Sequence, residues 1–383
     1  MRGRMRADAP FVLLDDARPG GADAQLYTAP LRTIVANTAV EVRPALDALD
    51  AAQAEGLHIA GYIAYEAGHA LEPKLGSPRG DGPLAWFGVF ERVEIIPAAE
   101  LAARLPDPAG AWLGRLKPGI TRSDYDAAFG RVREWIEAGD IYQANLTFRA
   151  SVPLFGDPLA AYAAVRQRAA AGYGGVVWTG SDWLLSFSPE LFFALRGGEL
   201  IARPMKGTTP RGATPEEDAA AKRMLASDAK QRAENLMIVD LMRNDLTRIA
   251  APGSVTVPEL FKVETYPTLH TMVSTVAAKL APGTSVGDVL AATFPCGSVT
   301  GAPKIRAMEV IGAVEPDARG AYTGSIGRID PNGDAAFNVA IRTLHLRAGG
   351  DSAMIGLGSG VVADSTAGEE WDECLAKGAF LTR

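Results

Sequence analysis

A hairpin pattern directly ahead of the sequence RPMKGTTPR most limits how this chain can fold. Two short apolar segments, residues 192–195 and 199–202, are separated by a glycine-rich turn, which predicts two antiparallel strands. Pairing across that turn places residues opposite each other when their numbers sum to about 395. Glu190 is then expected opposite Met205 and beside Lys206. The hairpin therefore predicts a carboxyl group and an amine at one end of a sheet.

The local sequence leaves two interpretations of the Glu190–Lys206 pair open. An exposed ion pair between neighbouring strands is common and contributes little. A functional pair is the alternative, because Lys206 lies between apolar residues and the turn residue Gly207, where a solvated lysine is not expected. Features further along the chain favour the functional interpretation.

The composition is that of a globular protein with a sizeable core. The 383 residues are 48% hydrophobic and 22% charged, a length that fits about two to three domains. A formal net charge of −7, with no basic run beyond the first six residues, argues against a nucleic-acid-binding surface. That basic start lacks an apolar h-region, and no segment approaches the ~18 apolar residues of a membrane span, so we expect a cytoplasmic protein.

Cysteine and histidine usage argues against two other classes. Cys296 and Cys374 are the only cysteines, too few for a disulfide framework or a four-cysteine zinc site, and we expect both to be buried thiols. The four histidines lie too far apart in sequence for a helical metal motif.

The order of the patterns predicts an N-terminal region, residues 1–110, and a second region, residues 120–383, folded as one intertwined unit. The segment 98–119, rich in alanine, proline and glycine, is the best candidate for a linker. An alanine-rich helix is predicted at 45–54. Apolar runs predict the strands of the first region, at 11–14, 59–65 and 84–90.

The second region is expected to begin with a helix and continue with strands. Apolar residues at helical spacing predict the helix over 121–139, with Ser123 as its N-cap. Alternating apolar and polar residues after it predict a strand over 141–148. Together with the apolar runs 176–179 and 184–187 and the hairpin above, this strand predicts an antiparallel meander.

Residues 214–249 predict a helix that carries one carboxylate on its apolar face. Ile238 and Leu241 follow Glu234 at steps of four and seven, so the three side chains share a stripe. A carboxylate at such a position is costly unless it meets a cation or a metal. A buried ion pair with an arginine is the alternative explanation.

Three C-terminal segments carry groups suited to an anionic ligand. The loop 294–304, FPCGSVTGAPK, leads into a helix, and backbone N–H groups at such a junction can bind an anion. Arg342 shares one face of a predicted strand, 337–344, with apolar neighbours and therefore needs an anionic partner. Residues 355–362, IGLGSGVV, predict a buried strand whose glycines permit close approach of a ligand.

An acidic helix follows that strand. Thr366 and Glu369 fit a capping box, which explains Glu369 without a functional role. Glu370, Glu373 and Lys377 share one face of the helix at spacings of three and four. Placed together with the buried glutamate described above, the two acids could hold Mg²⁺ through oxygen ligands.

These segments resemble, in order, the motifs of the chorismate-utilising enzyme family. The resemblance extends over residues 121–380 and implies an α+β fold (α/β in the broad sense) of two stacked, mainly antiparallel sheets flanked by helices. It also implies chorismate as substrate and Mg²⁺ as cofactor. The matching motifs are DIYQANLTFR, SPELFF, PMKGTTPR, RAENLMIVDLMRND, FPCGSVTGAPKIRAMEVI, YTGSIG, AIRT and GSGVVADSTAGEEWDECLAK.

Two positions indicate a branch of this family. Lys206 resembles the lysine of aminodeoxychorismate synthases, because anthranilate synthases and isochorismate-type enzymes have alanine there. Gln143 resembles the ammonia-using members, because the water-using members have a lysine at that position. The resemblance therefore implies amination of chorismate to 4-amino-4-deoxychorismate, in p-aminobenzoate and folate biosynthesis. Anthranilate synthase component I is the alternative, and a catalytically silent chorismate-binding subunit is a third.

The resemblance also implies roles for individual residues. Lys206 is the nucleophile and Glu190 the general acid, and burial beside a metal would favour the neutral amine of Lys206. His270 is expected near the enolpyruvyl ether, with a satisfied structural histidine as the alternative. The implied metal ligands are Glu234, Glu373 and Glu370. The implied substrate-binding residues are Arg342, Gly358, Ser359, Gly360, Thr208, Gln143, Tyr322, Gly301 and Lys304.

The chain departs from the family pattern in two places. Cys296 stands where the family usually has glycine, so a thiol enters that loop. Residues 11–30 only loosely resemble the segment that builds a tryptophan pocket, and we expect no tryptophan binding there. Neither cysteine lies in a G-x-C-x-G elbow, so the resemblance implies that a separate glutaminase, component II, or free ammonia supplies the nitrogen.

Overall fold

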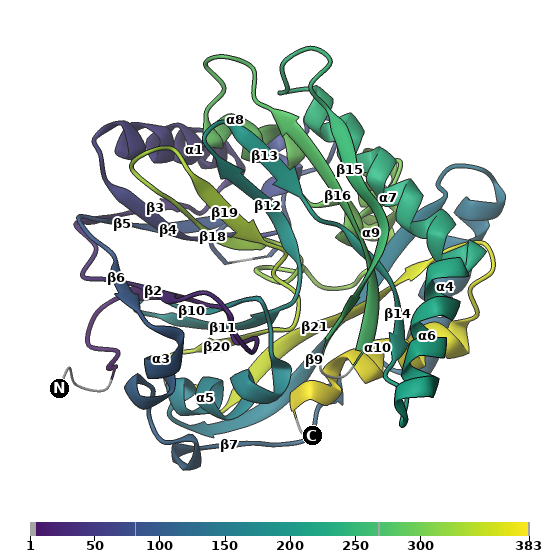
Figure 1. Cartoon of the computed structure of the whole chain (residues 1–383), viewed down its shortest axis with the longest axis horizontal. Coiled ribbons are helices and arrows are strands. Elements are labelled where there is room, and N and C mark those ends of the chain that lie inside the picture. The colour runs from purple at the N-terminus through teal and green to yellow at the C-terminus, as the bar shows by residue number, and fades with distance from the viewer. Residues whose placement is uncertain (1–4, 81, 267–268, 382–383) are drawn as a thin grey trace.

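The computed structural model describes residues 5–80, 82–266 and 269–381, so residues 1–4 of the basic start lie outside it. Within these ranges two antiparallel sheets, of eleven and ten strands, face each other and are flanked by helices (Figure 1). The expected two-sheet α+β fold is confirmed. None of the helices in the described ranges combines the length and the hydrophobicity needed to cross a bilayer.

The first sheet combines strands from both ends and the middle of the chain. Its order is β17-β9-β21-β20-β11-β10-β1-β2-β6, and β7 and β8 also pair with β9. Its strands are β1 (Phe11–Asp15), β2 (Ala24–Thr28), β6 (Glu94–Ile96), β7 (Ala111–Leu113), β8 (Lys117–Pro118), β9 (Gln143–Gly156), β10 (Tyr173–Trp178), β11 (Asp182–Ser188), β17 (Gly301–Ala302), β20 (Thr343–Arg347) and β21 (Ser352–Val361).

The second sheet has the order β14-β16-β13-β12-β19-β18-β4-β5-β3, with β15 also paired to β16. Its strands are β3 (Arg32–Ala36), β4 (His58–Ile63), β5 (Ala85–Phe90), β12 (Leu191–Arg196), β13 (Glu199–Ala202), β14 (Met205–Pro210), β15 (Thr256–Thr265), β16 (Leu269–Lys279), β18 (Ser325–Ile329) and β19 (Ala335–Asn338).

Helices cover the outer faces of the two sheets (Figure 1). Those on the second sheet include α1 and α8, while α5 packs on the first sheet and α10 packs on β21. The helices are α1 (Ala39–Ala54), α2 (Ala67–Leu71), α3 (Ala98–Arg104), α4 (Arg122–Glu137), α5 (Pro158–Ala169), α6 (Pro215–Ser227), α7 (Ala229–Thr247), α8 (Val286–Thr293), α9 (Lys304–Val314) and α10 (Ala367–Gly378), with 3-10 turns η1 (Pro108–Gly110), η2 (Gly297–Val299) and η3 (Ala379–Leu381).

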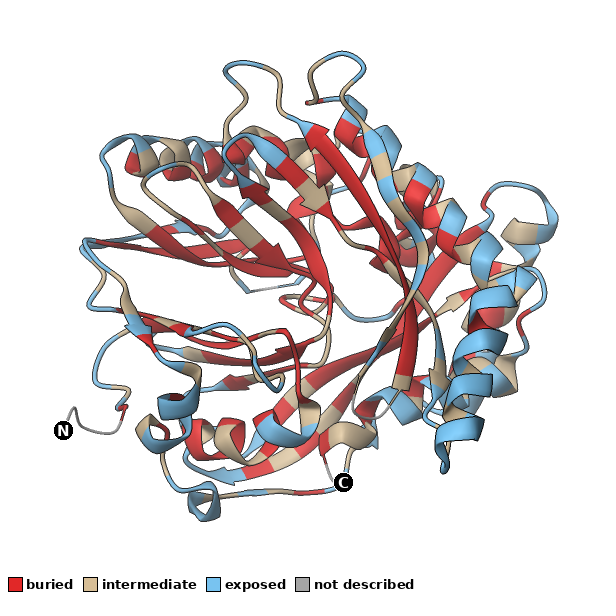
Figure 2. Ribbon diagram, in the orientation of Figure 1, coloured by how far each residue is buried: buried red, intermediate tan, exposed pale blue. Residues whose placement is uncertain are grey.

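Apolar side chains fill both the space between the sheets and the space under the helices. Val12 and Val177 from the first sheet meet Tyr62 and Trp86 from the second sheet in one buried cluster. Each sheet also packs against its helices through one larger buried cluster. The strands are thus buried on two faces (Figure 2), which explains why β5 is apolar at nearly every position instead of alternating.

The hairpin register predicted from the sequence is confirmed. Ala194 faces Ile201 and Leu195 faces Leu200 across the turn. The chain then leaves β13, and β14 pairs with β16 instead of continuing alongside β12. Met205 and Glu190 still line the same cavity, and the Met205 backbone N–H lowers the pKa of the Glu190 carboxyl group, so the two segments do meet.

Three other predictions of local structure are wrong. Thr121, not Ser123, caps α4, because its side chain accepts from the N–H of Asp124 in a capping box. The helix predicted over 214–249 is two helices, α6 and α7, separated at Asp228, which caps the second. The predicted meander is broken, because β9 pairs with β21 and the chain passes from the first sheet to the second between β11 and β12.

The segment proposed as a linker is structured. It contains α3, η1 and two short strands, β7 and β8, which both pair antiparallel with β9. Strands before and after this segment share both sheets, since β1 pairs with β10 and β4 pairs with β18. The boundary between the two proposed regions stays a prediction.

Candidate functional site

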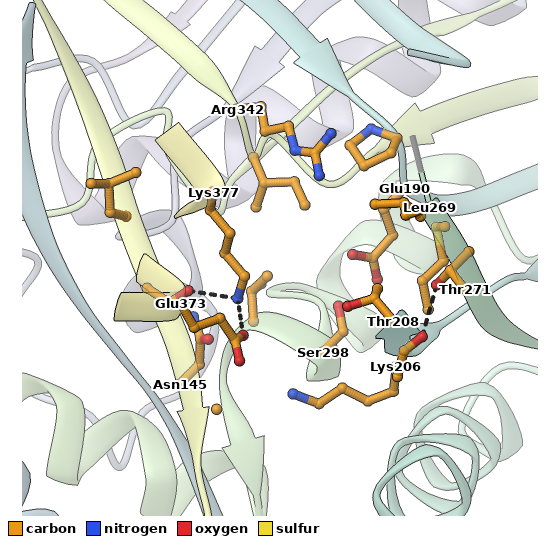
Figure 3. Close-up of a pocket in the computed structure, with 18 of the residues that line it drawn as sticks. Asn145, Glu190, Lys206, Thr208, Leu269, Thr271, Ser298, Arg342, Glu373 and Lys377 are labelled. Atoms are coloured by element: carbon orange, nitrogen blue, oxygen red, sulfur yellow. Dashed lines mark hydrogen bonds and ion pairs between the residues drawn. The ribbon is translucent and has the colours of Figure 1, made fainter. Parts of the chain in front are cut away.

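A cavity of about 330 Å³ lies where the two sheets diverge, between β14 and β21. The glycine-rich part of β21 forms one wall, β14 and the first turns of α7 form another, and α10 contributes its acidic face. Figure 3 shows Glu190, Lys206, Thr208 and Ser298 on one side of this cavity and Glu373 with Lys377 on the other. The residues that the sequence singled out in distant segments therefore meet at one place.

Three carboxylates, Glu234, Glu370 and Glu373, and three lysines, Lys206, Lys230 and Lys377, line the acidic end of the cavity. The Nζ atom of Lys206 lies 4.0 Å from Oε2 of Glu234. On the opposite wall the Lys377 ammonium lies 2.7 Å from a carboxylate oxygen of Glu373. Glu370 accepts a hydrogen bond of 2.6 Å from the Ser365 hydroxyl. Glu234 and Glu373 each have a lysine at ion-pair distance, whereas Glu370 forms no ion pair with another described residue.

The electrostatics of this end suit a divalent cation. Burial raises the pKa of Glu234, and the nearby Glu370 and Glu373 raise it further against the opposing effect of Lys206. Carboxylate oxygens are the ligands that Mg²⁺ prefers. Within residues 5–80, 82–266 and 269–381, no three His, Cys, Asp or Glu side chains are already gathered closely enough to hold a metal ion. The donor chemistry fits the ion, while the assembly of a site stays a prediction.

Glu190 lies on the wall formed by the hairpin and is almost fully buried, with 5% of its surface exposed. Burial raises its pKa to about 7, although hydrogen bonds from Ser298 and from the Met205 backbone, together with the charge of Lys206, act in the opposite direction. Its Oε1 atom is buried without a hydrogen-bond partner in the described structure. A carboxyl group in this state can donate a proton near neutral pH.

The position of the Lys206 amine depends on the absence of a side chain at Gly360, across the cavity. A Cβ atom at Gly360 would lie 2.5 Å from Nζ of Lys206 and 2.8 Å from Nε2 of Gln143. The absence of a side chain at Gly360 therefore gives both groups their space. Gln143 is fully buried, and neither polar atom of its side chain has a hydrogen-bond partner in the described structure. Its amide lies beside the amine without being engaged by the protein.

Arg342 lies at a different end of the cavity (Figure 3). The strand predicted over 337–344 is wrong, because β19 ends at Asn338 and β20 begins at Thr343 in the other sheet. Arg342 sits in the connection with φ of 50°, a left-handed conformation. Burial lowers its pKa, and no carboxylate among the described residues forms an ion pair with it. The guanidinium is therefore available for an external anion.

Two of the expected site residues, His270 and Lys304, are held by internal partners and do not line the cavity. His270 is bonded on both ring nitrogens, to Thr265 at 3.0 Å and to Asp218 at 2.9 Å, which is the alternative of a satisfied histidine. The Lys304 amine donates to Asp245 and to the Thr293 carbonyl at 2.7 Å. The structure thus gives both side chains internal partners.

The remaining expected residues divide into those on the cavity and those behind it. Gly358, Thr208 and Tyr322 line it. The Ser359 hydroxyl points the other way and donates to the Glu370 carbonyl at 3.4 Å. Gly301 lies behind the wall, where a Cβ atom would come within 2.2 Å of the Gln143 carbonyl oxygen. Its small size allows β17 to pack on β9.

Sequence reasoning missed two polar residues of the site. Ser298, in η2, lies beside Glu190. The sequence interpretation of this loop considered only its backbone N–H groups, so the serine side chain received no role. Lys377 was placed on the acidic face of α10 but given no role, although its amine also donates to the Gly358 carbonyl at 2.8 Å. Its spacing of four from Glu373 was the available signal.

Comparison with known protein families gives one match that covers nearly the whole chain. Residues 9–383 match the model described as chorismate binding enzyme. The chain belongs to this family. The resemblance found in the eight sequence motifs is thereby confirmed.

Several relatives are similar in sequence to this family member. It is 43% identical over 261 residues to aminodeoxychorismate synthase component 1 of Klebsiella aerogenes, which covers 68% of this chain and 57% of the relative. It is 38% identical over 288 residues to the protein of the same name from Bacillus subtilis (75% and 60%). It is also 40% identical over 262 residues to a protein named anthranilate synthase component 1 3 from Haloarcula marismortui (67% and 51%). The chain thus spans little more than half the length of these curated relatives.

Solved structures of other proteins share the fold. Anthranilate synthase component I from Streptococcus pneumoniae superposes with a TM-score of 0.82 at 27% identity, covering 99% of this chain and 93% of that one. MenF, the menaquinone-specific isochorismate synthase from Escherichia coli, superposes with a TM-score of 0.74 at 18% identity, covering 97% of this chain and 88% of that one. The second likeness concerns the fold alone.

Proposed function

We propose that this chain converts chorismate and ammonia to 4-amino-4-deoxychorismate, as component I of an aminodeoxychorismate synthase. The observation that carries this proposal is the position of Lys206, whose amine reaches the cavity 4.0 Å from Glu234 with Glu190 on the same wall. The names of the relatives from Klebsiella aerogenes and Bacillus subtilis agree with it. The product would serve p-aminobenzoate and folate biosynthesis.

The first step would be a substitution by the lysine. The amine of Lys206 forms a bond to C2 of the ring, the ring double bonds shift, and the C4–O bond breaks. Glu190 gives its proton to the departing hydroxyl, which leaves as water. The raised pKa of Glu190, about 7, keeps a proton available for this step near neutral pH.

The second step would reverse the displacement with ammonia. Ammonia forms a bond to C4 and gives one proton to the Glu190 carboxylate, the double bonds shift back, and the C2–N bond to Lys206 breaks, which frees the lysine and restores the general acid. The net reaction consumes chorismate and ammonia and releases the aminated product and water. Gln143, whose amide has no internal partner and lies beside Lys206, is suited to contact the incoming ammonia.

Opposite ends of the cavity would hold the two carboxylates of the substrate. Arg342 supplies an unpaired guanidinium for the enolpyruvyl carboxylate, at the end of the cavity away from the acidic residues (Figure 3). Glu234, Glu370 and Glu373 would hold Mg²⁺, whose charge would neutralise the ring carboxylate. A separate glutaminase, component II, or free ammonia would supply nitrogen, and we expect the reaction to be cytoplasmic.

The test is product identification with the purified chain. Chorismate, Mg²⁺ and an ammonium salt are incubated with the protein, and the products are separated and identified by mass. We expect 4-amino-4-deoxychorismate, which an added lyase converts to p-aminobenzoate. Anthranilate, detected by its fluorescence without added lyase, would contradict the proposal.

Anthranilate synthase component I is the second candidate. The likeness to the Haloarcula marismortui and Streptococcus pneumoniae proteins of that name favours it. That reaction aminates C2 and releases pyruvate, and it gives a covalent amine at Lys206 no task. Pyruvate release in the same assay without added lyase distinguishes the two functions.

A further inference from the structure

Two polar side chains behind Glu190 have no task in the proposed reaction. The Cys296 sulfur lies 3.3 Å from the Ser298 hydroxyl oxygen. Ser298 lies in turn beside the Glu190 carboxyl group on the cavity wall, and its hydroxyl favours the ionised form of that carboxyl group. Cys296 and Ser298 are 3% and 8% exposed, so the thiol lies in the interior and Ser298 reaches the cavity wall (Figure 3). The thiol, the hydroxyl and the carboxyl group therefore follow one another from the core to the site.

The number of hydrogens on these groups determines which group donates in each contact. The Ser298 hydroxyl has one hydrogen, and an ionised Glu190 can only accept it. The 3.3 Å contact must then be donated by the Cys296 thiol. Burial raises the pKa of Cys296 to about 12, and the nearby Glu190 acts in the same direction, so the thiol keeps its proton near neutral pH.

The loop holds these side chains in place. The Thr300 hydroxyl donates to the carbonyl of Cys296 at 3.2 Å. A Cβ atom at Gly297 would lie 2.4 Å from the Leu241 side chain, which shows how closely the loop packs on α7. The thiol and the hydroxyl therefore have little freedom to turn away from each other.

We propose that Cys296 is a positioning residue, whose thiol orients the Ser298 hydroxyl toward Glu190 and thereby sets the pH range over which Glu190 can deliver a proton. The consequence for catalysis rests on the proposed function, whereas the link between Cys296 and Glu190 does not. Because Cys296 departs from the family pattern at this position, the link is a feature of this chain.

Other charged groups also act on Glu190 and on Cys296. Glu190 faces Lys206 from β14 and Lys377 from α10, and both cations favour its ionised form. Cys296 faces Glu190 and, from α9, Lys304. Substitutions at Cys296 leave these lysines unchanged, so differences between variants report on the thiol itself.

The direct test is a titration of Glu190 by infrared spectroscopy, with the Glu190→Gln protein as the reference that identifies its carboxyl band. In Cys296→Ala the midpoint should rise by about half a pH unit, because the ionised form loses an aligned donor. Cys296→Ser keeps a donor and should restore the wild-type midpoint or lower it. Ser298→Ala removes the direct bond and should raise the midpoint by about one unit.

A double substitution distinguishes the relay from a general effect on packing. If the thiol acts through Ser298, Cys296→Ala should cause no further shift in the Ser298→Ala background. An equal shift in both backgrounds, or no shift in Cys296→Ala alone, would overturn the proposal. Thermal unfolding of each variant checks that the protein is folded, and Cys296→Ser provides the readout if Cys296→Ala is not.

A kinetic measurement then tests the catalytic consequence. With free ammonia held constant, the alkaline limb of kcat/KM for chorismate should move upward in Cys296→Ala by the same half unit, about threefold in proton concentration. If no aminated product forms, the proposed function fails while the infrared midpoint still tests the relay. If product forms and neither the midpoint nor the limb moves, the relay alone is refuted.

Discussion

Nζ of Lys206 lies 4.0 Å from Oε2 of Glu234, although the two residues belong to different elements, β14 and α7. The side chains are 19% and 16% exposed, so both are largely withdrawn from water. The contact places an amine at the edge of the acidic end of the cavity. The predictions below follow from this contact and from the groups around it.

The covalent role of Lys206 predicts an adduct that can be weighed. After exposure to chorismate without ammonia, the peptide containing Lys206 should gain the mass of chorismate less one water. Lys206→Ala should lose the adduct and at least about a thousandfold in turnover, since a nucleophile is removed, while still binding chorismate. The exposed Lys279 provides the control, because Lys279→Ala should keep both. Unchanged turnover in Lys206→Ala would refute the covalent step.

A methyl group at position 360 should displace the amine without unfolding the protein. The new Cβ atom would meet the ends of two flexible side chains, Lys206 and Gln143, at 2.5 and 2.8 Å. We expect Gly360→Ala to lower kcat by about a hundredfold or more, because a misplaced reacting atom is costly, with little change in melting temperature. Gly312→Ala, in α9 with nothing within 4 Å of its Cβ position, is the matched control and should retain activity.

Replacement of Arg342 by leucine should weaken chorismate binding and increase the stability of the folded protein. The guanidinium is buried enough that its pKa is lowered, and no carboxylate of the described residues offsets that cost. Arg342→Leu should raise KM for chorismate by about tenfold to a hundredfold and raise the free energy of unfolding by about 1 kcal/mol. Steady-state kinetics and urea unfolding measure the two effects.

The control for this result is an arginine with partners. Arg319 lies 2.7 Å from Glu315 in a buried ion pair and also donates to the Asn145 carbonyl. Arg319→Leu should destabilise the protein by about 3–5 kcal/mol, because it leaves a buried carboxylate unpaired. A loss of stability in Arg342→Leu as large as that in Arg319→Leu would contradict an unpaired Arg342.

Glu190 should make the stability of the protein depend on pH. Its pKa is raised from 4.5 to about 7, so between these values the folded state keeps a proton that the unfolded chain releases. This contribution is complete below about pH 4.5 and is lost as the pH rises through about 7. Relative to wild type, Glu190→Gln should therefore gain about 3 kcal/mol of unfolding free energy between pH 4.5 and about pH 8.

Chemical denaturation across that pH range measures the difference. Glu134→Gln removes an exposed carboxyl group from α4 and serves as the reference for changes in net charge. Parallel stability curves for wild type and Glu190→Gln over the whole range would show that the folded-state carboxyl group is not perturbed.

Mg²⁺ should bind through the acidic end of the cavity. Removal of metal with EDTA should abolish turnover, and excess Mg²⁺ should restore it. Glu373→Gln should weaken Mg²⁺ binding in the presence of chorismate by about tenfold or more, measured by calorimetry, because one anionic oxygen ligand is lost. The exposed neighbour Asp372 is the control, and equal Mg²⁺ affinities in Asp372→Asn and Glu373→Gln would exclude Glu373 as a ligand.

Local sequence patterns were sufficient where short-range forces decide the outcome. The hairpin that joins Ala194 to Ile201 follows from a glycine-rich turn between apolar segments, and its register followed from the length of the turn. The cap at Thr366 follows from one side chain and one nearby N–H group. Similarly, the position of Glu234 on an apolar stripe follows from the helical repeat.

Long-range pairing was outside the reach of those patterns. β9 and β21 are about two hundred residues apart in sequence, yet they pair over ten positions and form one wall of the cavity. An apolar strand can pair equally well with many others, so its partner depends on how the whole sheet closes. The interpretation of β9 as part of a meander failed for this reason.

The sequence by itself determined which chemical groups the protein has and on which local elements most of them lie. Only the tertiary structure decided their partners. It gave His270 and Lys304 internal partners, left Arg342 without a carboxylate, and set Ser298 between Cys296 and Glu190. The physical reason is that the availability of a polar group for chemistry depends on which neighbours satisfy or desolvate it. Those neighbours come from segments that only the closed fold brings together.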